Sequence, residues 1–290
     1  TINSLEKKIA SKGLRLRPGI KTPLTSKYRP EIDVSPELDT EDSSFYQSLI
    51  GSLRWIVEMG RIDICCEVSM MASQVAMPRE GHLQQVYHIF GYLKAHHNAR
   101  IMIDPSYPDI LIEDFKDEDW GKFYKVEKEP IPSNSPKPIG MEFVIRAFVD
   151  ADHAGDVVSR RSRTGFIVMV NGAPIYWLSK KQPGVETSTF GSEFLAMKHC
   201  CEYLRGLRYK ICMMGIPLEH CCFVYGDNKS VLFNTTLPES TLKRKHHSVA
   251  YHFVREGSAR DEWRTAYLST DDNCADICTK SLPNGINRKR

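Results

Sequence analysis

The stretch 143–178 reads FVIRAFVDADHAGDVVSRRSRTGFIVMVNGAPIYWL and contains three strand patterns in a row. Over 143–150 the side chains alternate along an apolar run, and two further apolar runs follow at 166–170 and 174–178. The last two runs are joined by Asn171-Gly172, a pair typical of two-residue hairpin turns. The stretch therefore predicts three consecutive antiparallel strands.

Beyond this stretch the pattern changes to alternating helices and strands. We expect, in order, a helix over 191–214, a strand over 222–225, a helix over 229–233, a helix over 249–259, a strand over 263–268 and a helix over 272–280 capped by Thr270. Three antiparallel strands followed by this alternation favour an α/β fold, a mixed five-stranded sheet flanked by helices. We assign this domain to residues 143–283.

The preceding residues divide into two parts. Residues 1–104 have helical periodicity, with helices expected from Phe45 (capped by Ser43 or Ser44), over 64–76 and over 83–93, and without a catalytic cluster. Residues 105–142 are rich in proline and carry an acidic run over 113–119. We expect this part to be a flexible, solvated linker. Residues 284–290 form a basic tail.

The composition is that of a globular protein, with 41% hydrophobic and 26% charged residues. A net charge of +3 permits a nucleic-acid partner without requiring one. No apolar run is long enough to span a membrane, and the sequence begins at Thr1 without a signal-peptide pattern. We therefore expect a piece of a longer protein that is cytosolic or nuclear and not secreted. The 9 cysteines are expected to be reduced thiols, since their spacing gives little support to a zinc site.

Four carboxylates occupy strand or helix ends in apolar surroundings: Asp150, Glu193, Asp227 and Asp276. Glu193 shares a predicted helix face with apolar residues such as Met197 and Leu204. A charge on such a face needs a partner, although a glutamate in a first helical turn is also favoured by the helix dipole. Asp227 follows a strand, where α/β folds place ligands, but it could instead cap the helix that begins near Lys229.

Several carboxylates in one pocket require cations, and Mg²⁺ is the usual choice because it prefers hard oxygen ligands. Two such ions can activate water and stabilise the leaving oxygen in phosphodiester cleavage. Basic residues surround the four acids along the sequence and are candidates for phosphate binding: Arg160, Arg161, Arg163, Lys180, Lys181, Lys243, Arg244 and Lys245. Ordinary surface charge is the alternative explanation for this basic group.

Many segments of the sequence, in the same order along the chain, resemble the Pol polyprotein of copia-type LTR retrotransposons. Those similar to its ribonuclease H lie at 148–156, 160–166, 173–177, 179–182, 192–196, 225–230, 251–256 and 275–280. Segments at 46–53, 61–64 and 92–94 resemble the connection region that follows the polymerase in that family. The resemblance implies a ribonuclease H-like domain preceded by a small helical connection region.

The resemblance also implies a site and a reaction. Asp150, Glu193, Asp227 and Asp276 correspond to the family's catalytic, metal-binding carboxylates, with two Mg²⁺ ions as cofactor and Mn²⁺ as a substitute. The implied reaction hydrolyses the RNA strand of an RNA–DNA hybrid and leaves a 3′-hydroxyl and a 5′-phosphate. The implied partners are the hybrid and the polymerase portion of the same Pol polyprotein, within a cytoplasmic retroelement particle.

The chain departs from the family pattern at three points. Phe190-Gly191-Ser192-Glu193 replaces a Thr-Glu-Ala-Glu run but keeps its second glutamate. Lys245-His246-His247-Ser248 lacks the aspartate of a Lys-His-Ile-Asp run, and the polymerase's Asp-Asp motif is absent. Two alternatives therefore stay open: a catalytically inactive fragment that acts as a nucleic-acid-binding or interaction module, and a DNA-acting nuclease of the same fold. The intact set of four acids favours the active ribonuclease H.

Overall fold

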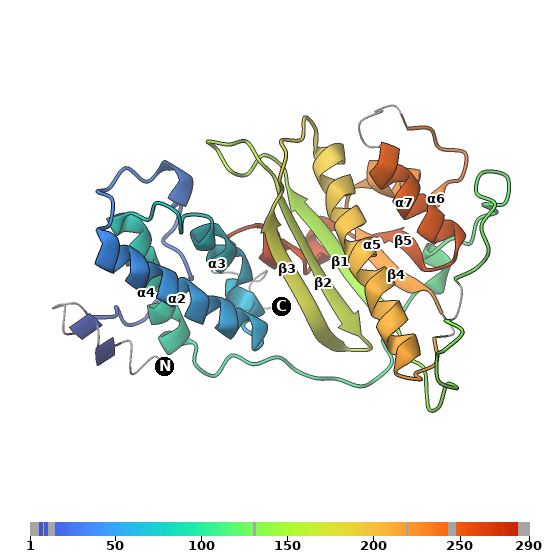
Figure 1. Ribbon diagram of the computed structural model, residues 1–290, viewed down its shortest axis with the longest axis horizontal. Coiled ribbons are helices and arrows are strands. Elements are labelled where there is room, and N and C mark those ends of the chain that lie inside the picture. The colour runs from blue at the N-terminus through green and yellow to red at the C-terminus, as the bar shows by residue number, and fades with distance from the viewer. Residues whose placement is uncertain are drawn as a thin grey trace.

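A computed structural model describes residues 6–7, 9–10, 15–129, 132–218, 220–242 and 248–283. Its C-terminal half holds a five-stranded sheet in the order β3-β2-β1-β4-β5 (Figure 1). The strands are β1 (Ile145–Asp152), β2 (Arg163–Val170), β3 (Ala173–Lys181), β4 (Cys222–Gly226) and β5 (Trp263–Tyr267). β1, β2 and β3 pair antiparallel, whereas β1, β4 and β5 run parallel. The predicted mixed α/β sheet is therefore confirmed.

One face of this sheet is covered by the long helix α5 (Thr189–Met213), with α7 (Ser248–Ala259) packed beside it (Figure 1). Inward-facing residues of β1 and β2, such as Val149 and Phe166, form a core there with Phe194 and Leu204 of α5. The short helix α6 (Lys229–Thr236) packs between α7 and β5. All three helices lie where the apolar periodicity predicts helices.

The last predicted helix, 272–280, is wrong in its extent. The structure has a 3-10 helix over Thr270–Asp272, with Ser269 rather than Thr270 at the N-cap position, and then the short α8 (Asp276–Thr279). The side chain of Asn273 separates the two helices. It accepts a hydrogen bond from Ala275 N and donates one to Val149 O at 2.9 Å, which ties the segment to β1 instead of continuing a helix.

The N-terminal half forms a helical unit of α2 (Thr40–Glu58), α3 (Cys65–Ala72) and α4 (Glu80–Ala95), with 3-10 turns at Pro30–Ile32 and Ile62–Ile64. The predicted cap at Ser43 or Ser44 is wrong, because Asp39 accepts the hydrogen bond from Asp42 N at 2.8 Å. The helix expected over 64–76 ends earlier, at Ala72.

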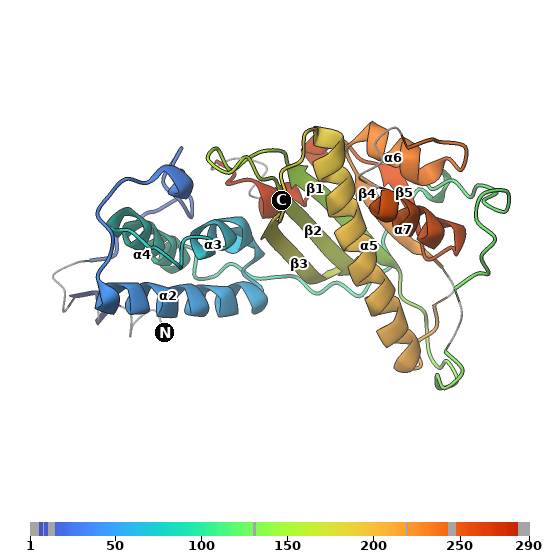
Figure 2. The same ribbon diagram turned by 45° about the horizontal axis from the view of Figure 1, so that its top comes forward.

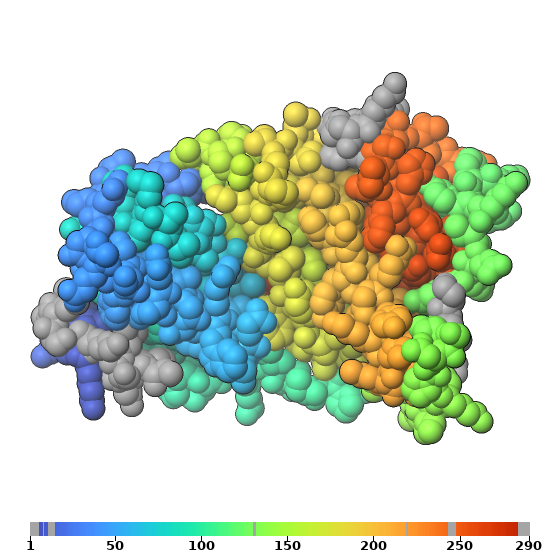
Figure 3. All heavy atoms as spheres, in the orientation of Figure 1, coloured from blue at the N-terminus to red at the C-terminus, as the bar shows by residue number. Residues whose placement is uncertain are grey.

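The helical unit packs directly on the second face of the sheet. Helix α3 contacts β3 and α8, and the core of the unit includes Ile167 of β2 and Cys278 of α8. In Figures 2 and 3 the helical unit, blue to cyan, lies against the yellow strands. The unit therefore shares a core with the α/β domain, although the domain boundaries proposed from the sequence remain a prediction.

The proline-rich segment 105–142 is not simply solvated, contrary to expectation. Phe115 and Trp120 are buried, and the ring of Phe115 packs edge-on against Phe223 at 4.8 Å between centroids. The indole of Trp120 lies 4.9 Å from the guanidinium of Arg255 on α7. These aromatic residues anchor the segment over β4 and β5, while most of its acidic side chains stay on the surface.

Among the described residues, no helix combines the length and the apolar character that a bilayer span requires.

Candidate active site

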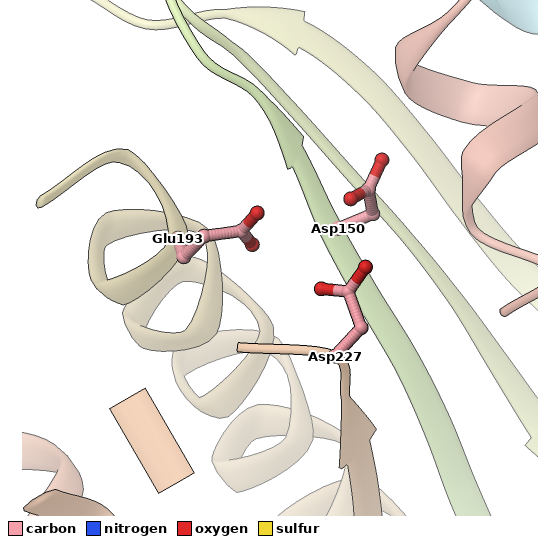
Figure 4. A group of neighbouring side chains, drawn as sticks. All are labelled: Asp150, Glu193 and Asp227. Atoms are coloured by element: carbon pink, nitrogen blue, oxygen red, sulfur yellow. The ribbon is translucent and has the colours of Figure 1, made fainter. Parts of the chain in front are cut away.

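Three of the four predicted carboxylates converge at one edge of the sheet. Asp150 comes from β1, Glu193 from the first turns of α5 and Asp227 from the residue after β4 (Figure 4). One carboxylate oxygen of each lies within 4.8 Å of the others. The arrangement offers a cation three oxygen ligands from three separate elements.

Strand register places two of these acids side by side. β1 and β4 are parallel, with Phe148 opposite Tyr225. Asp150 and Asp227 each follow two residues later, so both reach the same edge of the sheet. Glu193 lies in the first turns of α5 and faces the two aspartates (Figure 4). Ser188 caps this helix, since its side chain accepts a hydrogen bond from Gly191 N at 3.2 Å.

Asp227 does not cap the following helix. Asn228 does so, since its side-chain oxygen accepts hydrogen bonds from Ser230 N at 3.1 Å and Val231 N at 3.2 Å. The Asp227 carboxylate instead accepts a hydrogen bond from the Thr270 hydroxyl at 2.7 Å. The helix-cap alternative for Asp227 is therefore wrong, and its second oxygen is left for a ligand.

Burial and mutual repulsion perturb the carboxylates. Asp150 is only 1% exposed, and burial raises its pKa. Burial, followed by the charges of Asp150 and Asp227, raises the pKa of Glu193 to about 9. Without a cation the cluster therefore retains a proton at neutral pH, and a bound metal ion would displace it.

Asp276 lies next to Asp150 but outside the three-acid cluster. The Lys280 ammonium is 2.7 Å from Asp276 Oδ1 and 3.5 Å from Asp150 Oδ2. The Thr279 hydroxyl donates a hydrogen bond to Asp150 Oδ2. Sequence reasoning missed both Thr279 and Lys280, although the i,i+4 spacing of Asp276 and Lys280 was a usable signal.

The predicted phosphate-binding residues differ in their surroundings. Arg160, Arg161 and Lys180 are exposed, while Lys181 pairs with Asp156 at 2.8 Å. Arg163 donates a hydrogen bond at 2.6 Å to the Ser69 hydroxyl of α3, so it also ties the sheet to the helical unit. The predicted residues Lys243, Arg244 and Lys245 lie outside the described residues.

Gly165 controls how closely α8 approaches the site. It pairs with Asp150 across β1 and β2, and a Cβ at this position would lie 2.9 Å from Cys278 Cβ and clash with Thr279. We expect Gly165→Ala to push α8 outward and destabilise the protein by about 2 kcal/mol, a few degrees in melting temperature. Thermal denaturation measures this shift.

The matched control is Gly206→Ala on the exposed side of α5, where an added Cβ meets nothing within 4 Å. It should stabilise the protein slightly, because alanine favours a helix interior. Equal melting temperatures for the Gly165 variant and the wild type would contradict this account of the α8 packing.

No family model matches the chain. The chain is 27% identical to the retrovirus-related Pol polyprotein from transposon RE1 of Arabidopsis thaliana over 262 residues, 90% of this chain and 16% of that protein. It is 26% identical to the corresponding polyprotein from transposon RE2 of the same plant over 91% of this chain and 16% of that protein. It is 25% identical to a Pol polyprotein of Nicotiana tabacum over 82% of this chain and 15% of that protein. The chain thus spans about one sixth of the length of these relatives.

Solved structures with similarity to the chain include ribonucleases H. Ribonuclease H1 from Halobacterium salinarum NRC-1 aligns over 47% of this chain and 93% of its own, with 14% identity and a TM-score of 0.37. A foamy viral protease-reverse transcriptase in complex with double-stranded DNA covers 85% of this chain and 35% of its own, with 12% identity and a TM-score of 0.42. The strand order and pairing within this chain carry the assignment of a mixed five-stranded α/β fold.

Proposed function

Because this chain is homologous to the Pol polyproteins of copia-type retrotransposons over about nine-tenths of its length, we propose that it is a retroelement ribonuclease H. Its reaction is Mg²⁺-dependent hydrolysis of the RNA strand of an RNA–DNA hybrid. The observation that carries this proposal is the convergence of Asp150, Glu193 and Asp227 at one edge of the sheet. The polymerase portion of a Pol polyprotein is the proposed partner, within a cytoplasmic retroelement particle.

The three carboxylates fit a hard divalent cation. They are hard oxygen donors, and the raised pKa of Glu193 reflects its burial first and then the negative charges of Asp150 and Asp227 beside it. Mg²⁺ suits these ligands, with Mn²⁺ as a substitute. When bound, such ions activate a water molecule and stabilise the leaving oxygen of a phosphodiester.

Neighbouring residues of the chain orient the carboxylates. Hydroxyl donors fix one oxygen of Asp150, through Thr279, and one oxygen of Asp227, through Thr270. The remaining oxygen of each aspartate is thereby turned to a shared position. Hydrogen-bonded neighbours commonly orient metal ligands in this way. The exposed Arg160 and Lys180 bind the phosphates of the hybrid.

Lys280 tunes the affinity of this site for metal. Its ammonium lies between Asp150 and Asp276, and thereby competes with a cation for both carboxylates. We expect Lys280→Gln to tighten Mg²⁺ binding at least tenfold, roughly 1.4 kcal/mol, because the variant removes a positive charge that partly neutralises the carboxylates. Isothermal titration calorimetry with Mg²⁺ measures the change.

Lys198→Gln is the control, since Lys198 forms an ordinary i,i+4 ion pair with Glu202 on α5. An unchanged or weaker Mg²⁺ affinity in the Lys280 variant would show that the ammonium does not compete with the metal.

The proposal is tested by incubating the purified chain with an RNA–DNA hybrid whose RNA strand is labelled, with Mg²⁺ or with EDTA. We expect cleavage of the RNA strand in Mg²⁺ only, with 3′-hydroxyl and 5′-phosphate ends. Single-stranded RNA and a DNA duplex of the same sequence should remain intact. Hybrid binding without cleavage would support a non-catalytic module instead, and equal cleavage of the DNA duplex would support a DNA-acting nuclease.

A further inference from the structure

A cleft of about 530 Å³ separates the helical unit from the loop that joins β1 and β2. One wall is the loop that carries the Pro30–Ile32 turn, and the other is the β1–β2 loop together with Arg163, the first residue of β2. These two loops approach each other above α3 in Figures 1 and 2. We call this feature the junction cleft, since its two walls come from the two halves of the chain.

The lining of the junction cleft is positively charged. It includes three carboxylates, Glu31, Asp152 and Asp156, against six cationic residues: Lys27, Arg29, Arg161, Arg163, Lys181 and Lys280. The lining therefore carries a formal excess of three positive charges. Within the part of the chain that the structure describes, neither Lys27 nor Arg161 forms an ion pair. The surplus charge thus includes one exposed residue from each wall.

Hydrogen bonds between the two halves hold the walls in place. Arg29 donates to Gly155 O at 2.8 Å, and Val157 N donates to a carboxylate oxygen of Glu31 at 3.2 Å. At the base, Arg163 donates to the Ser69 hydroxyl at 2.6 Å. Each guanidinium has five N–H donors, so these contacts leave several donors of Arg29 and Arg163 for a ligand. The two walls of the cleft are therefore fixed by hydrogen bonds, and unused N–H donors remain available to a ligand.

The junction cleft adjoins the candidate active site. Thr279 and Lys280 line it, and both also contact Asp150. Asp152, two residues beyond Asp150 on β1, lines it as well. A strand with a phosphodiester at the carboxylate cluster therefore has a cationic path that leads directly into the cleft.

We propose that the junction cleft binds the sugar-phosphate backbone of a substrate strand beyond the bond that is cleaved. The helical unit then supplies one wall of the nucleic-acid-binding surface, through Lys27 and Arg29, in addition to its packing role. This inference rests on the proposed ribonuclease function for the identity of the ligand. Its contacts are to phosphates, so they add affinity without sequence preference.

The test uses the double variant Lys27→Gln/Arg161→Gln in the full chain, with a fluorescent RNA–DNA hybrid as probe. Binding is followed by anisotropy in EDTA, so that cleavage does not interfere. Loss of two phosphate contacts should weaken binding about tenfold near 0.1 M salt and reduce the slope of log affinity against log salt by about two. Both side chains are exposed, so the fold should survive, which thermal denaturation checks.

Lys21→Gln is the matched control, because Lys21 is exposed in the same N-terminal loop region but does not line the cleft. Hybrids with a single-stranded extension on either the RNA or the DNA strand identify which strand enters. An extension that improves binding to the wild type but not to the double variant supports the cleft and names the strand. Equal affinity and equal salt slope for wild type and double variant on every substrate would overturn the proposal.

The two proposals fail in distinguishable ways. A chain that cleaves the hybrid in Mg²⁺, but whose double variant binds normally, retains the ribonuclease function without the junction cleft. A chain that never cleaves, but whose double variant loses affinity, retains the cleft as a nucleic-acid site without the ribonuclease function.

Discussion

Replacing Asp227 by asparagine is expected to slow Mg²⁺-dependent cleavage of an RNA–DNA hybrid roughly a thousandfold, while hybrid binding changes little. Stabilisation of the transition state by metal ions depends on their anionic ligands. A thousandfold slower reaction corresponds to a loss of about 4 kcal/mol of this stabilisation. The amide keeps an oxygen that can accept the Thr270 hydrogen bond, so the loop after β4 should retain its shape. Single-turnover cleavage and anisotropy binding measure the two quantities separately.

Asn228→Ala provides the control for this experiment. It removes the side chain that caps α6 and should destabilise the protein by about 1 kcal/mol, while Asp227 keeps its charge. Cleavage should therefore persist in the Asn228 variant when it is assayed well below its melting temperature. Near wild-type cleavage by the Asp227 variant would remove Asp227 from the active site and undermine the metal mechanism.

The contrast between Asp227 and Asn228 shows where sequence reasoning stops. Both residue types cap helices well, so the sequence left the role of Asp227 open. The tertiary structure assigns the cap to Asn228 because the parallel pairing of β1 and β4 carries Asp227 to the sheet edge. The position of Glu193 was predictable, since an apolar helix face is a local pattern. Asp150 was predicted to end a strand over 143–150, which is wrong, because β1 runs from Ile145 to Asp152.

Helix α2 gives a second example of the same limit. Asp39, Ser43 and Ser44 are all acceptable capping residues, and periodicity alone favoured the later start. The helix begins earlier because the residues before it are held in place by partners far along the chain: Glu37 pairs with Arg79, and Leu38 N donates to Pro78 O at 3.0 Å. Such long-range pairing cannot be predicted from the local sequence pattern.

The packing of the proline-rich segment was unpredictable for a related reason. Its proline and acid content indicates an irregular chain, which it is, but irregular does not mean solvated. Phe115 and Trp120 have only a few apolar residues near them in the sequence, such as Ile112 and Phe123, and most of the residues between them are charged. The burial of Phe115 depends on the apolar surface that Phe223 and Tyr225 present on the sheet, and that of Trp120 on Arg255 of α7. Sequence patterns show which elements form, whereas the junction cleft and these contacts depend on how distant elements meet.

Glu193→Gln is expected to stabilise the metal-free protein at neutral pH and to abolish the stabilisation that Mg²⁺ provides. Burial beside Asp150 and Asp227 raises the pKa of Glu193 in the folded state to about 9, against an ordinary value of 4.5. A raised folded pKa contributes stability that is fully present below pH 4.5 and is lost as the pH rises to about 9. The wild type should thus lose roughly 3 kcal/mol between pH 4.5 and pH 7, at about 1.4 kcal/mol per pH unit. Glutamine is neutral throughout, so the variant lacks this loss.

Denaturant unfolding across pH 5–8, in EDTA and in Mg²⁺, measures both effects. In EDTA the variant should be the more stable protein, by an amount that grows with pH. Addition of Mg²⁺ should raise the stability of the wild type, because the ion replaces the proton on Glu193 and binds only the folded chain. The variant should not respond, whereas the control Glu239→Gln, at an exposed position, should follow the wild type in both conditions. If wild-type stability in EDTA does not fall between pH 5 and pH 8, or if Mg²⁺ stabilises the Glu193 variant equally, Glu193 is not a buried metal ligand that holds a proton until the ion arrives.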